Sequence, residues 1–323
     1  MKAIHITKAG GPEVLELKEA DSEPLKPGQV RIAIKAAGVN RSDLLTRKNP
    51  DAYGADAAKA VIPGLEVSGE IIEVASDVTQ FQLNDKVCAL VAGGGYATEI
   101  AVDARLCLPI PNELTFIEAA SLPEVLFTVW FNVFMQADAK RGEGLLIHGG
   151  TSGIGIMGLQ MAKALGLMTY TTVGSEEKVH FIKEHNLAQV INYKKKDFEE
   201  VFKEEKIDVI LDMIGGDYTL KNMNLLATKG RLVHINGMNG LKPQIDLWML
   251  MSKQLTLIGS LLKPQSVEVK HQIAKDLQQH IWPLLESGSI RVFIDKTFAL
   301  ADAAEAHRLM ESSEHIGKIV LEV

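Results

Sequence analysis

The chain has 323 residues, 46% of them hydrophobic and 23% charged, with a net charge of −7. This length can bury a large core and predicts two domains. The acidic balance lacks the basic face that nucleic acid requires, so no nucleic-acid partner is expected. We also expect no apolar run long enough to span a bilayer, and no membrane partner. Two cysteines provide no disulfide framework, which favours a cytoplasmic location.

The first third of the chain has the pattern of a mainly β domain. Residues 1–6 lack the basic region and long apolar stretch of a secretory signal, and we expect them to form a strand. Short β-like runs follow, separated by turn residues such as Pro27-Gly28 and Pro63-Gly64. The expected strands cover residues 30–36, 70–75, 86–91 and 97–102.

Strands alternate with helices from about residue 114, after which a helix is expected over residues 117–136. Six strands are then expected at residues 145–148, 168–173, 190–193, 208–213, 231–235 and 255–261. Helices are expected between them, around residues 155–165, 176–185, 198–204 and 218–227. Strands joined by right-handed helical connections build a doubly wound parallel sheet, and six of them match the fold that binds dinucleotides.

The end of the chain changes character once more. A polar helical stretch runs from Pro264 to Ser287, and β-like sequence returns at residues 292–297 and 318–323. We expect this tail to rejoin the first domain, which would make that domain discontinuous.

The segment from Leu145 to Gly155 is the most informative in the chain. An apolar strand ends in a glycine cluster, and a helix begins at once. Small residues let the backbone approach a pyrophosphate, which the free amides and dipole of a helix start stabilise. Gly150 and Gly155 fill the first and last places of G-x-G-x-x-G, whereas Ser152 fills the middle one. We expect a dinucleotide here rather than a mere tight turn, bound by Gly150, Thr151, Ser152, Gly153 and Ile154.

The end of the second strand distinguishes NADPH from NADH. Enzymes that bind NAD usually place an acid there, but this chain has Gly174 and Ser175, with Lys178 one helical turn later. Ser175 and Lys178 can bind a 2′-phosphate, and Tyr193 at the end of the next strand can lie against it. Glu176 and Glu177 would instead favour NADH, although acidic residues at the start of a helix also stabilise the helix dipole. The alternative makes Lys178 a solvated helix residue and Tyr193 ordinary packing; we predict NADPH.

Several motifs along the chain carry a family resemblance. They are residues 10–13 (GGPE), 38–44 (GVNRSDL), 63–69 (PGLEVSG), the glycine loop, 211–216 (LDMIGG) and 317–320 (GKIV). In this order they resemble the medium-chain dehydrogenase/reductase superfamily, and within it the zinc-free NADPH:quinone oxidoreductases, especially the p53-inducible group. The resemblance covers nearly the whole chain.

The resemblance implies an α/β architecture of two domains. A GroES-like, mainly β catalytic domain would comprise residues 1–122, completed by residues 268–323. An NADPH-binding, doubly wound six-stranded Rossmann domain would comprise residues 123–267. The resemblance also implies a homodimer, formed by pairing the last sheet strand, around residues 255–262, with its copy in the partner.

The resemblance also bears on metal binding. Zinc-dependent members supply a cysteine from the segment matching residues 38–43 and a histidine from the segment matching residues 64–66. This sequence has Asn40 and Leu65 there, and leucine cannot ligate zinc. Two distant cysteines cannot build the four-cysteine structural lobe, and the nine histidines are scattered. We therefore expect no metal.

Without a metal to polarise a carbonyl, the acceptor must take a hydride readily, as a quinone or conjugated enone does. Asn40 can hydrogen-bond the nicotinamide or the substrate, and Tyr53 matches a tyrosine of related reductases that could steer the substrate or donate a proton. In the alternatives, Asn40 only caps residues 41–43 and Tyr53 lies in a surface loop. Thr128 matches a nicotinamide contact, or is a buried helix threonine. Further cofactor contacts are expected at Gly215, Asn236, Gly237, Met238, Ser260, Leu261, Leu262 and Lys318.

These observations predict an NADPH-dependent quinone oxidoreductase that transfers hydride without zinc to a quinone or similar conjugated acceptor. Two alternatives stay open at this point. One is an NADPH-dependent enoyl or enone reductase, which needs the same loop and the same region around Tyr53. The other is a protein that binds NADPH without significant turnover.

Overall fold

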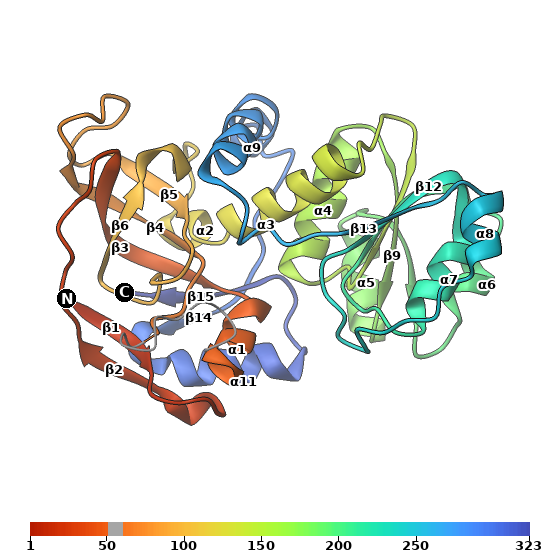
Figure 1. Ribbon diagram of the computed structural model, residues 1–323, viewed down its shortest axis with the longest axis horizontal. Helices are drawn as coiled ribbons and strands as arrows, with labels where there is room; N and C mark the ends of the chain where they lie inside the picture. Colours follow the sequence, from red (N-terminus) through yellow and green to blue (C-terminus); the bar gives the residue numbers. More distant parts are fainter. Residues whose placement is uncertain (51–60) are drawn as a thin grey trace. The chain divides into compact units, whose positions relative to one another are not determined.

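The computed structural model describes residues 1–50 and 61–323. Its contacts divide the chain into two compact units. Unit 1 contains Met1–Glu124 and Ser266–Val323, and unit 2 contains Val125–Gln265. The boundaries expected at 122/123 and 267/268 each lie two residues from these. Both chain ends therefore belong to unit 1 (Figure 1).

Unit 1 is built on strands that are mainly antiparallel. One sheet has the order β14-β15-β3-β4-β5-β7, with β6 also paired to β3, and β1 and β2 form a separate pair. The strands are β1 (Lys2–Ile6), β2 (Leu15–Glu19), β3 (Gln29–Val39), β4 (Glu66–Val74), β5 (Lys86–Leu90), β6 (Glu99–Asp103), β7 (Cys107–Pro109), β14 (Ile294–Ala299) and β15 (Lys318–Glu322). Because β15 pairs with β3, the tail rejoins the first domain, as the sequence predicted.

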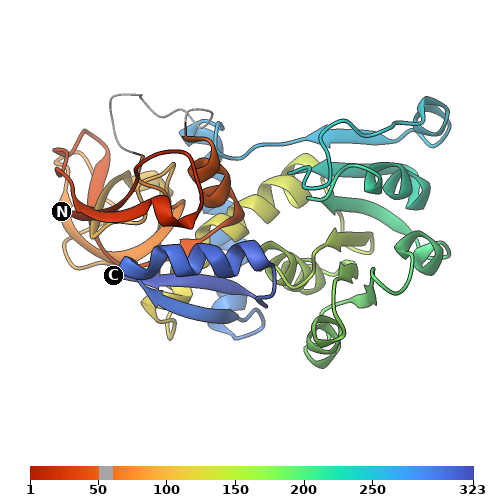
Figure 2. The same cartoon turned by 90° about the horizontal axis from the view of Figure 1, so that it is seen from below.

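Helices of unit 1 are short apart from α9. They are η1 (Pro12–Val14), α1 (Arg41–Lys48), η3 (Ala104–Leu106), α2 (Phe116–Ala119), α9 (Val267–His280), α10 (Trp282–Glu286), η5 (Leu300–Asp302) and α11 (Ala303–Ser312). The helix expected from residue 264 to 287 is in fact two, because Pro283 has no N–H to continue α9 and instead opens α10. Helix α11, which was not predicted, lies along β14 and β15 (Figure 2).

The core of unit 1 lies on the sheet formed by these strands. Ile32 of β3, Ile71 of β4 and Val87 of β5 are fully buried, and Ile4 of β1 is 1% exposed. Burying each such side chain stabilises the fold by about 1.5–3 kcal/mol before the entropy cost is subtracted. This packing fixes β3, whose end carries the candidate catalytic residue Asn40.

Unit 2 is a doubly wound domain with six parallel strands in the order β10-β9-β8-β11-β12-β13. The strands are β8 (Gly144–His148), β9 (Met168–Val173), β10 (Gln189–Asn192), β11 (Ile207–Asp212), β12 (Leu226–His234) and β13 (Thr256–Gly259). Every residue of the central strands β8 and β11 is buried, as helices on both faces require. The predicted fold class is confirmed.

Helices cover both faces of this sheet. They are α4 (Gly153–Ala164), α5 (Glu176–Glu184), α6 (Phe198–Phe202), α7 (Tyr218–Leu225) and α8 (Leu247–Ser252). Helix α4 lies on one side, and α6 and α7 lie on the other (Figure 1). Helix α7 ends earlier than predicted because β12 begins at Leu226, and α8 was not predicted.

The apolar stretch Phe116–Gln136 differs from two expectations. By length and composition it could cross a membrane, contrary to the prediction that no run could. However, 78% of its most apolar window is buried in the fold, which is typical of a core helix. It is also not one helix, since α2 ends at Ala119. Helix α3 (Pro123–Val129) starts at a proline, a residue favoured at the first helical position, and continues as the π-helix η4 (Trp130–Gln136).

Candidate functional site

The glycine loop joins β8 to α4 in unit 2. The N–H groups of Gly149 and Gly150 donate to Thr172 O at 3.0 and 3.2 Å, which anchors the loop to β9. A Cβ on Gly150 would lie 2.1 Å from Thr171 Oγ1, and one on Gly155 would lie 2.3 Å from Gly149 O. Side chains are therefore excluded at both positions that the motif reserves for glycine. The backbone there can approach a ligand closely.

Ser152 accounts for the departure from the full glycine motif. It is the N-cap of α4, since its Oγ accepts the Gly155 N–H at 3.0 Å and donates to Gly149 O at 2.8 Å. The first helical amides, of Gly153 and Ile154, have no intrahelical partner and lie at the positive end of the helix dipole. Together with the buried Thr151, this loop fits the pyrophosphate of a dinucleotide.

Residues predicted to select NADPH adjoin one another at the ends of β9 and β10. Ser175 is the N-cap of α5, and its Oγ accepts the Lys178 N–H at 3.3 Å. A Cβ on Gly174 would lie 2.7 Å from Tyr193 Oη, so only glycine lets the tyrosine ring lie this close. The Tyr193 side chain is half-exposed. Gly174, Ser175 and Tyr193 therefore flank one surface at the end of the second strand.

Glu176, which weighed against NADPH in the sequence, is engaged elsewhere. Its Oε1 accepts a hydrogen bond from Asn192 Nδ2 at 2.7 Å and pairs with Lys195 Nζ at 3.2 Å. These partners hold the pKa of Glu176 below its usual value. Sequence reasoning missed Lys195, although the run of three lysines directly after the third strand was a visible signal.

The turns after β11 and β12 pack on each other. Asp212 Oδ1 accepts the Gly215 N–H at 3.2 Å and fixes a turn in which Gly215 has a φ of 66°. A Cβ on Gly215 would lie 2.9 Å from Gly237 Cα, so the two glycines permit this contact. Asn236 Oδ1 accepts the Gly237 N–H at 2.7 Å. Met238, which follows, is half-exposed.

The turn after β13 holds the last group of predicted cofactor residues. Ser260 N–H donates to His234 O at 3.0 Å, whereas the Ser260 hydroxyl is buried without a hydrogen-bond partner. Leu261 is exposed and Leu262 is partly buried. Thus the predicted residues that follow the sheet strands all lie at the carboxyl edge of one parallel sheet, where this fold binds ligands. Their individual contacts with a cofactor stay predictions.

Two buried residues of unit 2 have simpler roles. His148 is bonded to Thr172 Oγ1 at 3.0 Å and to Asn222 Oδ1 at 2.8 Å, and burial lowers its pKa. It therefore packs as a neutral imidazole at the end of β8. Thr128 is buried in α3, and its carbonyl accepts Asn132 Nδ2 at 2.8 Å. Its predicted contact with the nicotinamide stays a prediction.

Asn40 in unit 1 stands at the end of β3 and is the N-cap residue of α1. Its N–H donates to Asp43 Oδ2 at 2.8 Å. Its side-chain Oδ1 accepts from Lys318 Nζ at 2.7 Å, and its Nδ2 donates to Glu66 Oε1 at 2.8 Å. Asn40 thus caps residues 41–43, as the alternative interpretation held, and its carboxamide also bonds a buried ion pair.

Lys318 and Glu66 complete this cluster. Lys318 Nζ lies 2.5 Å from Glu66 Oε1 and 3.3 Å from Val39 O. With Asn40 these partners use all three donors of the ammonium, and the predicted contact of Lys318 with the cofactor stays untested. Sequence reasoning missed Glu66, although it lies inside the quoted motif at residues 63–69.

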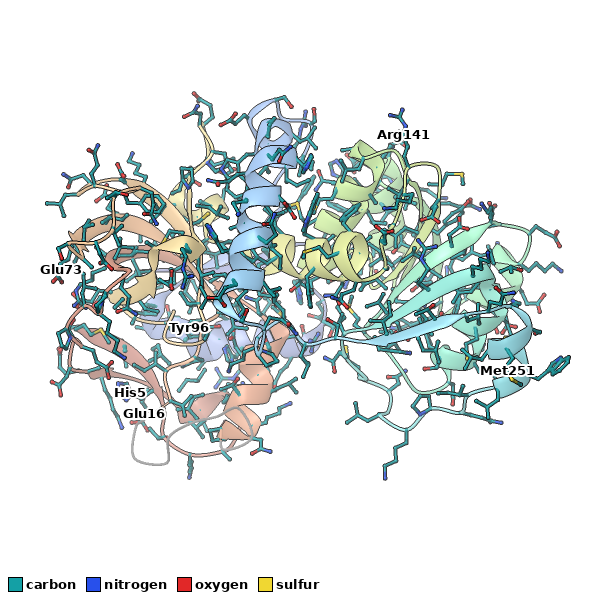
Figure 3. All side chains as sticks on the ribbon, turned by 45° about the horizontal axis from the view of Figure 1, so that its top comes forward. His5, Glu16, Glu73, Tyr96, Arg141 and Met251 are labelled. Carbon is teal, nitrogen blue, oxygen red and sulfur yellow. The ribbon has the colours of Figure 1, made fainter. Side chains whose placement is uncertain are left out.

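Asp43 is a structural residue that helps to cap α1, because its Oδ2 accepts the Asn40 N–H, whereas Arg41 donates to Ser313 Oγ. Asp43 Oδ2 accepts the Tyr96 hydroxyl at 3.0 Å, and that hydroxyl lies 3.2 Å from His307 Nε2. Burial raises the pKa of Asp43 to about 6 and lowers that of His307 to about 3. Figure 3 labels Tyr96 within unit 1.

Tyr53 and the two cysteines complete the description. Tyr53 lies outside the described residues, so its predicted role stays a prediction. Cys88 and Cys107 are free and buried, and burial raises the pKa of both thiols. They are therefore poor nucleophiles, as expected of core residues.

A separate hollow of about 700 Å³ lies within unit 1, between β5, β7, η3 and α9. None of the residues predicted for catalysis or cofactor binding lines it. Its side chains are Gln80, Phe81, Asp85, Lys86, Val87, Ala104, Arg105, Cys107, Pro109, His271, Ala274, Lys275 and Gln278.

A mainly β unit formed by both chain ends and a doubly wound unit with a glycine loop define a medium-chain dehydrogenase/reductase. Residues 26–112 match the family model for the alcohol dehydrogenase GroES-like domain. Residues 186–321 match the model named zinc-binding dehydrogenase. Unit 1 is accordingly GroES-like.

Comparison with individual proteins narrows the family. Quinone oxidoreductase of Mus musculus is 32% identical over 330 residues, covering 99% of this chain and 97% of that protein. The crystal structure of Escherichia coli quinone oxidoreductase complexed with NADPH aligns over the whole of both chains, with 27% identity and a TM-score of 0.88. An NAD-dependent alcohol dehydrogenase aligns equally fully, with 25% identity and the same TM-score.

The chain belongs to the quinone oxidoreductase family of the medium-chain dehydrogenase/reductase superfamily. It is therefore an oxidoreductase that uses a nicotinamide cofactor. Fold similarity alone does not select the cofactor, because the structural relatives include an NAD-dependent enzyme and an enzyme complexed with NADPH.

Proposed function

We propose that this protein is a zinc-independent NADPH:quinone oxidoreductase, which transfers hydride from NADPH to a quinone or a similar conjugated acceptor. The observation that carries the proposal is the Lys318 ammonium, bonded to both Asn40 and Glu66. The positive charge of Lys318 beside Asn40 would repel a zinc ion bound there. The substrate carbonyl must therefore accept hydride without a metal ion to polarise it. Quinones do so because conjugation spreads the charge that develops.

The scarcity of side chains that could ligate zinc also supports a zinc-independent reaction. Among residues 1–50 and 61–323, no group of three or more His, Cys, Asp or Glu side chains could hold a metal ion. Asn40 and Leu65 stand where zinc-dependent members supply cysteine and histidine. We propose that this chain has no metal site, and that its match to a model named zinc-binding dehydrogenase concerns the fold alone.

Selection of NADPH is supported by the turn after β9. Gly174 leaves room beside Tyr193, while Ser175 and Lys178 offer a hydroxyl and an ammonium to a 2′-phosphate. Glu176, the residue after Ser175, is already bound by Asn192 and paired with Lys195, so its repulsion toward a phosphate is reduced. The Escherichia coli relative was crystallised with NADPH, which agrees with this assignment.

In this proposal, residues of the chain bind the cofactor, orient the acceptor and donate hydrogen bonds to it. The loop amides of Gly150 to Ile154 hold the pyrophosphate, and the turns at Gly215, Asn236 to Met238 and Ser260 to Leu262 hold the nicotinamide half. When bound, the nicotinamide supplies the hydride. Asn40 donates a hydrogen bond to the acceptor oxygen, which gains negative charge as hydride arrives. Tyr53 steers the acceptor or supplies the proton that completes reduction.

Steady-state rates with two acceptor panels test the proposal. We expect NADPH oxidation with simple benzoquinones and naphthoquinones, and much lower kcat/KM with enones and enoyl thioesters. Activity confined to the second panel would establish an enone reductase instead. Binding of NADPH that raises the melting temperature, with no turnover on either panel, would establish a binding protein.

We further propose that the protein is a cytoplasmic homodimer. Strand β13 is the last strand of its sheet in the described chain, and a free strand edge favours pairing with a second copy. Exposed apolar side chains lie near it in sequence, including Trp248 at 75% and Met251 at 64%, both on α8. Figure 3 labels Met251 at this outer helix. The two free, buried cysteines agree with a reducing compartment.

A further inference from the structure

Asn40, Glu66 and Lys318 form a closed ring of hydrogen bonds in unit 1. Lys318 Nζ donates to Asn40 Oδ1 at 2.7 Å and to Glu66 Oε1 at 2.5 Å, while Asn40 Nδ2 donates to the same Glu66 oxygen at 2.8 Å. Asn40 is 7% exposed, Glu66 0% and Lys318 5%. These hydrogen bonds fix both the oxygen and the nitrogen of the Asn40 carboxamide.

The sheet topology brings these three residues together. Asn40 follows directly on Val39, the last residue of β3, and β3 is paired antiparallel with β15 on one side and β4 on the other. Lys318 is the first residue of β15, and Glu66 is the first residue of β4. Since antiparallel strands place the start of one beside the end of its neighbour, both charges flank the end of β3.

The surrounding chain is adapted to hold the ion pair. Glu66 Oε2 accepts the Glu124 N–H at 2.9 Å, and Lys318 also donates to Val39 O. A Cβ on Gly38 would lie 2.2 Å from Glu66 Oε1, so only glycine leaves space for the carboxylate there. Desolvating a charged pair is costly and adds little net stability. A buried pair with this much support therefore suggests a role other than stability.

We propose that Lys318 and Glu66 are positioning residues, which orient the Asn40 carboxamide so that its second N–H is directed at the acceptor oxygen. Lys318, which only donates, must take Oδ1, and Glu66, which as a carboxylate only accepts, must take Nδ2. The amide therefore cannot flip, and one Nδ2–H remains for the substrate. This inference rests on the proposed function, since it concerns the same hydride acceptor.

The orientation matters for catalysis because a preorganised donor needs no rearrangement as the oxygen gains charge. No covalent bond to these residues forms, Lys318 keeps its protons and Glu66 stays a carboxylate. Without Lys318, the Asn40 oxygen loses its charged partner and the amide can rotate. Its oxygen could then face the acceptor oxygen and repel it.

Four proteins test the proposal: the wild type, Lys318→Met, Glu66→Gln and the double variant. Each single variant leaves one buried charge unpaired and is expected to melt at a lower temperature. The double variant removes both charges and is expected to regain most of the lost melting temperature. We expect its Kd for NADPH to stay within about twofold of wild type, while its kcat with a quinone stays about tenfold or more below wild type.

A purely structural pair predicts the opposite for the double variant, namely recovery of both melting temperature and kcat, and that result would overturn the proposal. So would a Kd for NADPH raised about tenfold or more by Lys318→Met, because it would place Lys318 at the cofactor. Arg231→Met is the matched control, since Arg231 forms a partly buried ion pair with Glu143 in unit 2. It is expected to lower the melting temperature and leave kcat unchanged.

A readout independent of activity is the side-chain amide of Asn40, observed by NMR with ¹⁵N-labelled asparagine and assigned through Asn40→Asp. In the wild type we expect slow hydrogen exchange of the Nδ2 proton that Glu66 accepts, and fast exchange of that proton in the double variant. Equal exchange rates in the two proteins would overturn the inference even if quinone reduction is confirmed. A wild type that shows the protected amide but reduces no acceptor would instead refute the proposed function alone.

Discussion

Replacing Gly155 with alanine should disable the phosphate loop. The new Cβ would lie 2.3 Å from Gly149 O, and ordinary contacts begin at 3.4 Å, so the loop backbone must move by about 1 Å. Overpacking of this kind costs about 1–3 kcal/mol, and the better helix propensity of alanine returns about 1 kcal/mol. We therefore expect a net loss of about 0–2 kcal/mol and a melting temperature lower by no more than about 4 °C.

Cofactor binding should suffer more than stability, because the displaced amides are those proposed to hold the pyrophosphate. We expect the Kd for NADPH, measured by fluorescence titration, to rise at least about tenfold, or about 1.4 kcal/mol. Gly158→Ala is the matched control on the same helix, since the atoms nearest its Cβ belong to the side chains of Ile147 and Val129 and not to the loop backbone. That variant should keep the wild-type Kd. Wild-type affinity in Gly155→Ala would refute the assignment of this loop.

Three further predictions concern the cofactor, acid stability and assembly. Lys178→Ala should raise the Kd for NADPH about tenfold and leave the Kd for NADH unchanged. The control Lys183→Ala, in the last turn of α5, should change neither Kd. Equal losses of affinity for both cofactors would contradict the assignment of Lys178 to the 2′-phosphate. Burial lowers the pKa of His307 to about 3, so the unfolded chain takes up a proton first as pH falls below about 6.5. Relative to His307→Gln, the wild type should therefore lose about 3 kcal/mol of stability by pH 4 in urea titrations, and parallel pH profiles would disprove this. Met251→Glu should shift the protein from dimer to monomer in light scattering, and an unchanged mass would count against pairing beside β13.

The fold was predictable from sequence where periodicity is strong. Strand β9 has the predicted bounds because its β-branched run is closed by Gly174, and the glycine loop was recognised from residues that lie next to one another. Helices α8 and α11 were not predicted. The first is short, with six residues and no buried side chain, so no apolar periodicity distinguishes it from a loop.

The candidate site was predictable where neighbours in sequence form it, and not where the sheet assembles it. Asn40 was identified, but its partners Glu66 and Lys318 lie 26 and 278 residues away. Only the pairing of β3 with both β4 and β15 brings them together, and a single sequence carries no record of that register. For the same reason the sequence did not reveal that Val39, Asn40 and Glu66 surround the Lys318 ammonium, whose expected contact with the cofactor stays a prediction.

Reduction of a quinone by NADPH without a metal ion is tested most directly on chelator-dialysed wild-type protein. Its zinc content is measured by mass spectrometry, and the oxidation of NADPH is followed after a quinone is added. We predict full activity with no bound zinc, no change on adding Zn²⁺, and a kcat/KM at least about tenfold lower with NADH. Activity that disappears on dialysis and returns with Zn²⁺ would contradict the proposed function.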